Sequence, residues 1–262
     1  MKVTIITVVY NGAATLRDCM QSVVSQTHPD LEYIVVDGQS TDGTRAIVES
    51  FGAGVSRFVS EPDGGIYDAM NKGIALATGE VIGLLNADDF YAHDRVIERV
   101  VRTFEQTGCG AVYGNLVYVD PQDTRHVRRY WRAGAYQPGA FLWGWMPPHP
   151  TFFVKKSAYD QFGRFTLELK SAADYELMLR LLHRHGVRPA YLDEVLVTMR
   201  TGGVSNRTLH HRLAANREDR KAWQLNGLRP FFFTIWLKPL RKIAQFVPGL
   251  RTKQPSARQA AL

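Results

Sequence analysis

The stretch Val81-Ile82-Gly83-Leu84-Leu85-Asn86-Ala87-Asp88-Asp89-Phe90 decides the fold, because a short apolar run ends abruptly in a polar cluster. The run follows Thr78-Gly79-Glu80 and is typical of a strand buried on both faces of a parallel sheet. In open α/β sheets, ligands bind beyond the carboxyl ends of the strands, which is where this polar cluster would lie.

Two interpretations of the polar cluster stay open on this stretch alone. Asp89 or Asp94 could cap a helix that begins near Arg95, since aspartate is a common capping residue. Alternatively, the adjacent Asp88 and Asp89, which repel each other unless a cation lies beside them, could hold a divalent metal ion. Magnesium typically takes one or two carboxylates together with substrate phosphates.

The residues before this stretch alternate between apolar strands and amphipathic helices, with a short polar loop after each strand. Strands are predicted at residues 3–10, 31–36 and 57–60. Helices are predicted up to about Ser25, over about 44–50, and along the face of Ile66, Met70, Ile74 and Ala77. The alternation predicts an α/β protein with a doubly wound, mainly parallel, Rossmann-like sheet. The sequence contains neither a G-x-G-x-x-G turn nor a Walker lysine loop, which argues against a dehydrogenase and a P-loop enzyme.

Composition narrows the function classes. The 262 residues carry 32 Lys and Arg against 25 Asp and Glu, and a hydrophobic content of 45% is ordinary for a globular protein. Two cysteines, Cys19 and Cys109, exclude a disulfide framework and favour a reduced, cytosolic setting. The sequence contains no apolar run of 18 residues, so no membrane span is predicted. The N-terminal apolar run is expected to be a strand rather than a signal peptide.

The positive charge is concentrated near the C-terminus. Residues 206–262 contain 12 Lys and Arg against two acids, whereas residues 1–205 contain 20 bases and 23 acids. A basic tail on a slightly acidic body indicates an anionic surface as the partner of the tail. It argues against a nucleic-acid binder, which would carry its bases over the body.

The tail has an aromatic and basic pattern. Residues 209–226 are predicted to form a basic helix, and residues 231–247 alternate aromatic and basic side chains. Pro239 is expected to kink or break any helix there. The pattern is typical of a segment that lies in the plane of a membrane interface, and a helix packed on the preceding domain is the alternative. Residues after Pro248 are polar and are expected to be disordered.

Four motifs follow one another in the first 90 residues: Thr7-Val8-Val9-Tyr10-Asn11-Gly12, Val35-Val36-Asp37-Gly38-Gln39-Ser40-Thr41-Asp42-Gly43-Thr44, Asn71-Lys72-Gly73-Ile74-Ala75-Leu76-Ala77-Thr78-Gly79 and Leu85-Asn86-Ala87-Asp88-Asp89. In this order and spacing the chain resembles family 2 glycosyltransferases of the GT-A fold. The nearest likeness is to bacterial enzymes of exopolysaccharide or O-antigen assembly, including the colanic-acid type. The resemblance implies a nucleotide-sugar donor and a glycan or polyprenyl-linked acceptor.

The resemblance also assigns roles to residues on the donor side. It implies that Tyr10 and Asp37 line the nucleoside pocket, that Asp88 reaches the ribose, and that Asp89 binds the metal, Mg²⁺ or Mn²⁺. Such a metal would stabilise the charge that builds on the leaving diphosphate. Further donor-binding candidates are Asn11, Asp42, Lys72, Asn86 and Arg200. Ordinary structural roles stay open: a loop Asx-turn for Asp37 and Asp42, a solvated helix position for Lys72, and a surface position for Arg200.

The acceptor side is expected in the second half of the chain. Strands are predicted at residues 111–119, 126–131, 151–154 and 195–198. Trp143 and Trp145 could stack on sugar rings or simply pack in the core. His149 resembles a family feature near the sugar.

Asp174 is the candidate catalytic base. Its place in the first turn of a predicted helix suits a helix-stabilising acid. However, inverting members of the family carry an Asp base in an Ala-Asp-Tyr-Glu context like that of residues 173–176. An inverting transfer needs one carboxylate that takes the proton of the acceptor hydroxyl on the face opposite the diphosphate. Glu176 is the alternative base.

These patterns together predict a metal-dependent inverting glycosyltransferase of cell-surface polysaccharide biosynthesis. Residues 1–205 would form the GT-A domain, with the donor half in 1–90 and the acceptor half in 91–205. Residues 206–248 would form a membrane-associating helical segment, and 249–262 a disordered tail. The protein is expected in the cytoplasm, bound peripherally to the inner face of the cell membrane. A catalytically silent nucleotide-sugar-binding or scaffold protein is the alternative, and the sequence does not name the nucleotide, sugar, acceptor or linkage.

Overall fold

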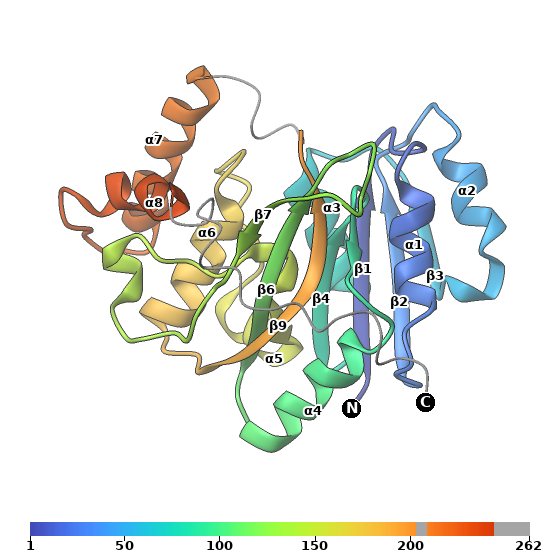
Figure 1. Ribbon diagram of the computed structural model, residues 1–262, viewed down its shortest axis with the longest axis horizontal. Coiled ribbons are helices and arrows are strands. Elements are labelled where there is room, and N and C mark those ends of the chain that lie inside the picture. Colours follow the sequence, from blue (N-terminus) through green and yellow to red (C-terminus); the bar gives the residue numbers. More distant parts are fainter. Residues whose placement is uncertain (203–208, 244–262) are drawn as a thin grey trace.

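The computed structural model describes residues 1–202 and 209–243 and is built around a mixed sheet of nine strands. The strand order is β3-β2-β1-β4-β8-β6-β9-β5, with β7 paired to β6 beside this path. The strands are β1 (Val3–Val9), β2 (Leu31–Asp37), β3 (Arg57–Ser60), β4 (Val81–Asn86), β5 (Asp89–Tyr91), β6 (Ala111–Val119), β7 (Val127–Trp131), β8 (Phe153–Lys155) and β9 (Pro189–Arg200). Figure 1 shows helices on both faces of this sheet.

The helices fall into two layers. The α-helices are α1 (Leu16–Val24), α2 (Thr44–Ser50), α3 (Ile66–Leu76), α4 (Val96–Thr107), α5 (Lys156–Phe162), α6 (Ala173–Met178), α7 (Leu209–Leu225) and α8 (Thr234–Ile243). Short helical turns are η1 (Gly52–Gly54), η2 (Ala140–Trp143), η3 (His149–Thr151) and the π-helical η4 (Leu179–Arg184), which continues α6. One core cluster contains buried residues of α1, α2 and α4, and the other contains those of α3, α5, α6 and α7.

The first half of the chain forms the parallel sheet that its sequence predicts. β3, β2, β1 and β4 lie side by side and pair in parallel. In β1, Ile6 and Val8 face the layer of α3, whereas Val3 and Ile5 face the layer of α1. Burial on both faces explains why β1 and β4 are nearly continuous apolar runs. Ile66 is an exception to the predicted helix face, because it is the first residue of α3 and remains exposed.

The second half joins this sheet through antiparallel pairs. β8 pairs with both β4 and β6 in antiparallel fashion, and β9 runs parallel to β6. The predicted strand at 151–154 begins later, since Thr151 belongs to η3. The short β5 was not predicted from the sequence: it lies within the polar cluster itself and pairs Asp89 with Met199 of β9.

The C-terminal helices pack on the domain, as the alternative interpretation of the tail expected. Trp223 of α7 is fully buried and its Nε1 donates a hydrogen bond to the Tyr175 hydroxyl at 2.9 Å. Lys238 of α8 lies 2.8 Å from both carboxylate oxygens of Asp219 and 3.9 Å from the centre of the Tyr175 ring. Of the expected kink or break at Pro239, the break is wrong, because α8 continues through this residue to Ile243.

Two further expectations concern membrane spans and the tail end. No helix in the part of the chain that the structure describes is long and apolar enough to cross a bilayer. The predicted disorder after Pro248 falls on residues outside the described ranges.

Gly73 sets the distance between α3 and β1. A Cβ atom built on Gly73 would lie 2.4 Å from Cγ2 of Ile6, which is too close for two carbon atoms. We therefore expect Gly73→Ala to lower the free energy of unfolding by about 1–3 kcal/mol, measured by urea denaturation. Gly43→Ala is the control, because its Cβ would meet Ala13 Cβ at an ordinary 3.7 Å. Equal losses in the two variants would contradict this account.

The ion pair of Lys238 and Asp219 is largely buried, with side-chain exposures of 17% and 6%. Lys238→Met would leave the Asp219 carboxylate without its cation, so we expect a loss of about 3 kcal/mol in the free energy of unfolding. The double variant Asp219→Leu with Lys238→Met removes both charges and should recover most of this loss. A double variant no more stable than the single one in urea would show that the pair is not the cause.

Candidate functional site

The register of the parallel strands brings the predicted donor residues to one edge of the sheet. Asp37 lies opposite Val9 of β1 and Ser60 of β3, and Asn86 lies opposite Val8. The loops that follow these strands therefore begin at the same level, at the carboxyl ends of β1, β2, β3 and β4. This is the edge at which open α/β sheets bind ligands.

Asp37 ties together segments at this edge of the sheet. Its buried carboxylate accepts hydrogen bonds from the backbone N–H of Ser40, at 3.1 Å, from the Ser40 hydroxyl, and from the Ser60 hydroxyl at 2.7 Å. Asn11, at a positive φ of 50°, accepts a bond from the Thr41 N–H at 2.9 Å. The first two loops are thus tied together by side chains that were predicted to bind the donor.

Tyr10, whose ring is exposed, lies beside Gly38. A Cβ atom on Gly38 would lie 3.4 Å from Cδ2 of Tyr10 and 2.5 Å from Oδ2 of Asp63, so a larger residue would crowd both groups. Gly38 thus brings together an aromatic ring and a carboxylate, which are groups that a planar base can use for stacking and for hydrogen bonding. Asp63 was not singled out from the sequence, where Asp63-Gly64-Gly65 is an ordinary turn.

Asp42 and Lys72 have clear structural partners. Asp42 accepts bonds from the N–H groups of Ala13, at 3.1 Å, and Thr44, at 2.9 Å, so the Asx-turn alternative describes it well. Its hydrogen bonds with Thr44 lower the pKa of Asp42. Lys72 donates to the Pro62 carbonyl at 2.7 Å and lies 2.9 Å from Glu61, which raises the pKa of Lys72. Lys72 is therefore engaged with the loop after β3 rather than freely solvated.

The acidic pair lies where β4 meets β5. Asp89 is completely buried, and its Oδ2 accepts a hydrogen bond from Nδ2 of Asn86 at 3.1 Å. Burial, and then the nearby charge of Asp88, raise the pKa of Asp89 well above its ordinary value. Asp88 is half-buried, and burial raises its pKa as well. The helix-cap alternative is wrong, because Arg95 is the N-cap residue of α4 and the N–H of Ile97 in its first turn donates to Oε1 of Gln26 at 3.0 Å, not to an aspartate.

Arg200 supports this pair from the end of β9. Its guanidinium donates to the backbone carbonyl of Asp88 at 2.9 Å, pairs with Asp18 and lies over the ring of Phe90. The side chain is buried, so the surface alternative for Arg200 is wrong. The positive charge of Arg200 favours the ionised forms of Asp88 and Asp89 and so opposes the effect of burial on both pKa values.

The donor set at the acidic pair suits a divalent ion that takes its other ligands from a substrate. Oδ1 of Asn86 and Oδ1 of Asp89 are both buried, and neither accepts a hydrogen bond from any residue that the structure describes. Within residues 1–202 and 209–243, no three His, Cys, Asp or Glu side chains converge on one point. Two carboxylates and unpaired oxygens, without a full protein cage, are what magnesium and similar ions use beside a diphosphate.

Asp174 lies in α6, on a different element from the acidic pair. The half-buried carboxylate is in the first turn of α6 and accepts a hydrogen bond from the Tyr67 hydroxyl at 3.3 Å. Burial lowers the pKa of His149, and the negative charge of Asp174 opposes this. His149 and Tyr67 both pack against Phe165, so these three residues surround the Asp174 side of the site.

Tyr118 links the two acidic groups. It lies opposite Met199 of β9, and Met199 lies opposite Asp89 on its other side. The pKa of Tyr118 is raised chiefly by burial and, to a smaller extent, by the charges of both Asp89 and Asp174. The charges of the metal candidate and the base candidate thus both disfavour ionisation of this phenol. Neither Tyr67 nor Tyr118 carried a signal in the sequence.

The remaining acceptor candidates have other surroundings. Glu176 is buried in a two-point ion pair with Arg180, at 2.8 and 3.1 Å, and accepts a further bond from Asn226. Trp145 is buried and donates a hydrogen bond to the Ala133 carbonyl, so its surroundings agree with the core-packing alternative. Trp143 is exposed and contacts aromatic residues of the C-terminal segment.

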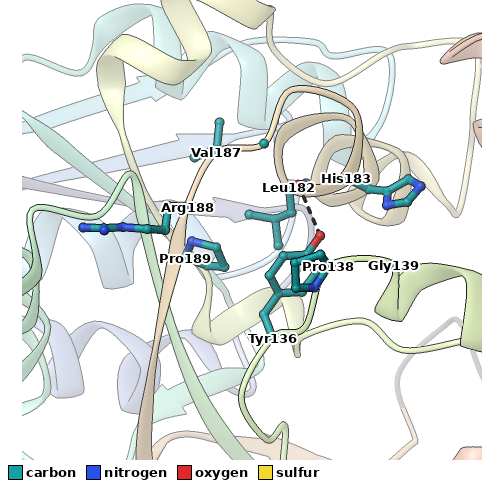
Figure 2. A pocket seen from close by; sticks show the side chains of 9 residues that line it. Tyr136, Pro138, Gly139, Leu182, His183, Val187, Arg188 and Pro189 are labelled. Carbon is teal, nitrogen blue, oxygen red and sulfur yellow. Dashed lines mark hydrogen bonds between the residues drawn. The ribbon is translucent and has the colours of Figure 1, made fainter.

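A separate pocket of about 580 Å³ lies at the start of β9 and contains none of the predicted site residues. Figure 2 shows Tyr136, Leu182 and Val187 around it, with the Tyr136 hydroxyl donating to the Leu182 carbonyl at 3.3 Å. Arg188 points away from this pocket and donates to the Thr107 carbonyl. The pocket is at the amino end of β9, whereas Arg200 at the carboxyl end supports the acidic pair.

Comparisons with known proteins agree with this geometry. Residues 4–171 match the model of glycosyl transferase family 2. A PGL/p-HBAD biosynthesis glycosyltransferase of Mycobacterium bovis is 29% identical over 201 residues, covering 75% of this chain and 76% of the relative. An uncharacterized glycosyltransferase of Mycobacterium tuberculosis is 31% identical over 185 residues, covering 68% of each chain.

Two solved structures share the fold. S. aureus TarS 1-349 in complex with UDP-GlcNAc aligns with a TM-score of 0.67 and 18% identity, over 86% of this chain and 65% of that chain. The mannosyltransferase PcManGT from Pyrobaculum calidifontis, in complex with GDP-Man and Mn²⁺, aligns with a TM-score of 0.61 and 20% identity, over 97% and 76%. The fold is therefore GT-A, as the order of the sequence motifs predicted. Since the family model spans more than half of its length, the chain belongs to glycosyl transferase family 2.

Proposed function

We propose that this protein is a metal-dependent inverting glycosyltransferase that moves a sugar from a nucleoside-diphosphate sugar to a glycan or polyprenyl-linked acceptor. The observation that carries the proposal is the acidic pair at the carboxyl ends of the parallel strands, where buried Asp89 keeps one oxygen without a partner among the described residues. Asp174 carries a further carboxylate, bonded to Tyr67, and the charges of both Asp89 and Asp174 raise the pKa of Tyr118. The acidic pair suits a diphosphate with its cation, and Asp174 suits an acceptor hydroxyl.

The donor would bind at the carboxyl ends of the parallel strands. The base would stack on Tyr10 above Gly38, with Asp37 holding the loop and Asp63 within reach of the base. Asp88 faces solvent more than Asp89 does and is the member of the pair that a ribose or an incoming ion would meet first. TarS with UDP-GlcNAc and PcManGT with GDP-Man support a nucleotide sugar as the donor class.

The residues of the acidic pair would hold Mg²⁺ or Mn²⁺, through Asp89 with Asp88 beside it. Such an ion, when bound, stabilises the charge that develops on the diphosphate as the glycosidic bond breaks. Asn86 holds one oxygen of Asp89, and Arg200 holds the Asp88 backbone, so both carboxylates are oriented before the donor arrives. Pre-oriented groups need no reorganisation during the reaction.

Asp174 would take the proton of the acceptor hydroxyl as the new glycosidic bond forms. The Tyr67 hydroxyl donates to one of its oxygens, which leaves the other free to face the acceptor. Burial keeps His149 mainly neutral near pH 7, because it lowers the pKa of this group. A neutral imidazole has one N–H donor and one acceptor nitrogen, so His149 could orient a sugar hydroxyl through a hydrogen bond in either direction.

The setting of the reaction is the remaining part of the proposal. We infer a role in cell-surface polysaccharide biosynthesis, with residues 1–205 as the catalytic domain, 206–248 as the membrane-associating segment and 249–262 as a tail. The protein would lie in the cytoplasm against the inner face of the cell membrane, to which the 12 bases of the C-terminal 57 residues are attracted. The alternative, a silent binding or scaffold protein, predicts donor binding without any hydrolysis or transfer.

The metal assignment predicts a response that does not depend on turnover. Asp89 is costly to ionise in its buried position, so Mn²⁺ should raise the melting temperature of the wild-type protein. Asp88→Asn and Asp89→Asn should each lose most of this rise and most of the activity. Asp120→Asn, in an exposed turn, should keep both. Full turnover of the wild-type protein in EDTA would refute metal dependence.

The base assignment separates Asp174 from Glu176. Asp174→Asn should lower the transfer rate by about 100-fold or more while leaving donor affinity unchanged. Glu176→Gln breaks the buried pair with Arg180, so it should lower the melting temperature but spare the rate of the folded fraction. Calorimetric titration with the nucleotide product would measure donor-site affinity. A loss of that affinity in Asp174→Asn would place Asp174 in the donor site instead.

A further inference from the structure

Aromatic side chains from two distant parts of the chain meet on one surface. Trp143 of η2 lies 6.2 Å from Phe231 and 5.4 Å from Phe233, measured between ring centres. Four rings are strongly exposed, namely Phe232 by 86%, Trp236 by 59%, Trp143 by 56% and Phe231 by 46%. We call these four residues the aromatic surface.

The aromatic surface is mounted firmly on the domain. The Thr234 hydroxyl donates to the Leu142 carbonyl at 2.6 Å, and Arg241 donates to the Trp143 carbonyl at 3.1 Å. Gly144 lies so close to α8 that an added Cβ would be 2.5 Å from the backbone nitrogen of Lys238. These contacts fix α8 against η2, so the exposed rings cannot turn inward without breaking the packing of Thr234 and Ile235, which are buried.

The charge around the aromatic surface identifies its partner. No acidic residue follows Asp219 in the sequence, whereas nine Lys and Arg do. Arg229 and Arg241, which flank Phe231, Phe232 and Trp236 along the chain, are both exposed. Aromatic rings beside exposed cations, in a stretch of sequence that carries no acids, match the headgroup region of an anionic bilayer, where Trp and basic residues are favoured. A second copy of this chain would bring like charges together.

We propose that Trp143, Phe231, Phe232 and Trp236 insert together into the headgroup region of an anionic membrane, while Arg229 and Arg241 pair with lipid phosphates. This inference deepens the membrane association proposed above and rests on it, but not on the chemistry of Asp174. It also gives Trp143 a role at the membrane instead of at the acceptor sugar.

The proposal has a consequence for the acceptor. Lys238 of α8 contacts the ring of Tyr175, and Tyr175 follows Asp174 in α6. The helix that meets the bilayer is therefore in direct contact with the helix that carries the base. Such an arrangement holds the acceptor side close to the lipid surface, which suits an acceptor whose lipid tail remains in the membrane.

Co-sedimentation with vesicles tests the aromatic surface. Point substitutions are used rather than removal of α8, because a protein without α8 would lack Lys238 and leave the buried Asp219 unpaired. Vesicles of phosphatidylglycerol and phosphatidylcholine should bind the wild-type protein, and pure phosphatidylcholine vesicles should bind it much less. The double variant Phe232→Ser with Trp236→Ser should bind about 100-fold more weakly, at about tenfold for each ring. Phe232→Leu with Trp236→Phe should restore binding, because apolar side chains remain.

Trp143→Ser tests whether the two segments act together. It should weaken vesicle binding by about tenfold. A residue of the acceptor site would instead change the Michaelis constant for the acceptor in detergent and leave vesicle binding intact, which would overturn the assignment of Trp143.

Donor hydrolysis without lipid should be unchanged in the Phe232 and Trp236 variants. An inactive wild-type protein that still binds vesicles would refute the enzyme proposal but not this one.

Arg229→Gln tests the charge. It should weaken binding to anionic vesicles about fivefold and reduce the salt dependence. Arg45→Gln on α2, at the opposite end of the sheet in Figure 1, removes an exposed charge and should have no effect.

Wild-type binding by the double serine variant would overturn the proposal. So would a dimer in light scattering that this variant abolishes, because the surface would then contact a second copy.

Discussion

The rest of the site depends on one constraint, the burial of the Asp89 carboxylate where β4, β5 and β9 meet. An anion without solvent is costly unless cations or donors surround it. Asn86 satisfies one oxygen, Arg200 supplies a positive charge through the neighbouring backbone, and Oδ1 has no partner among the described residues. Because the partners of Asp89 leave one of its oxygens unpaired, a cation beside Asp88 and Asp89 would be favourable. The same strand pairing sets Asp89 opposite Met199, whose neighbour on the other side is Tyr118, and the charges of both Asp89 and Asp174 raise the pKa of Tyr118.

The C-terminal helices hold the segment around Asp174 in place rather than merely following the domain. Glu218 accepts hydrogen bonds from the backbone N–H groups of Lys170 and Ser171, immediately before α6. Asn226 donates to Glu176, and Lys238 lies over Tyr175. Three side chains beyond the family match thus hold the segment that begins with Asp174. A boundary at residue 205 separates a slightly acidic part of the sequence from a strongly basic part. It does not separate two packing units, because α6 and the residues just before it contact residues beyond this boundary.

The sequence predicted those parts that depend on local pattern. The strands β1 to β4 and the helices between them follow from apolar runs ending in polar loops, and the family follows from motifs in order. Other features depend on contacts that no local pattern shows. Arg200 is indistinguishable from a surface arginine until β9 pairs with β5 and buries it. Tyr67 and Tyr118 are ordinary aromatic residues until the fold places them beside acidic groups. Pro239 favours a break locally, yet tertiary contacts hold α8 together around it.

Charge and packing also answer different questions about the tail. Its composition indicates an anionic partner but not which face meets it, because alternating aromatic and basic residues suit either a buried or an interfacial helix. Packing divides the residues: Thr234 and Ile235 are buried and Lys238 pairs with Asp219, while Phe232 and Trp236 stay outside. The packed-helix interpretation therefore applies to one side of α8, and the interfacial interpretation is our proposal for the other side. On a membrane, a helix that is packed on one side and aromatic on the other would hold the domain in a fixed orientation, which a flexible basic tail alone would not do.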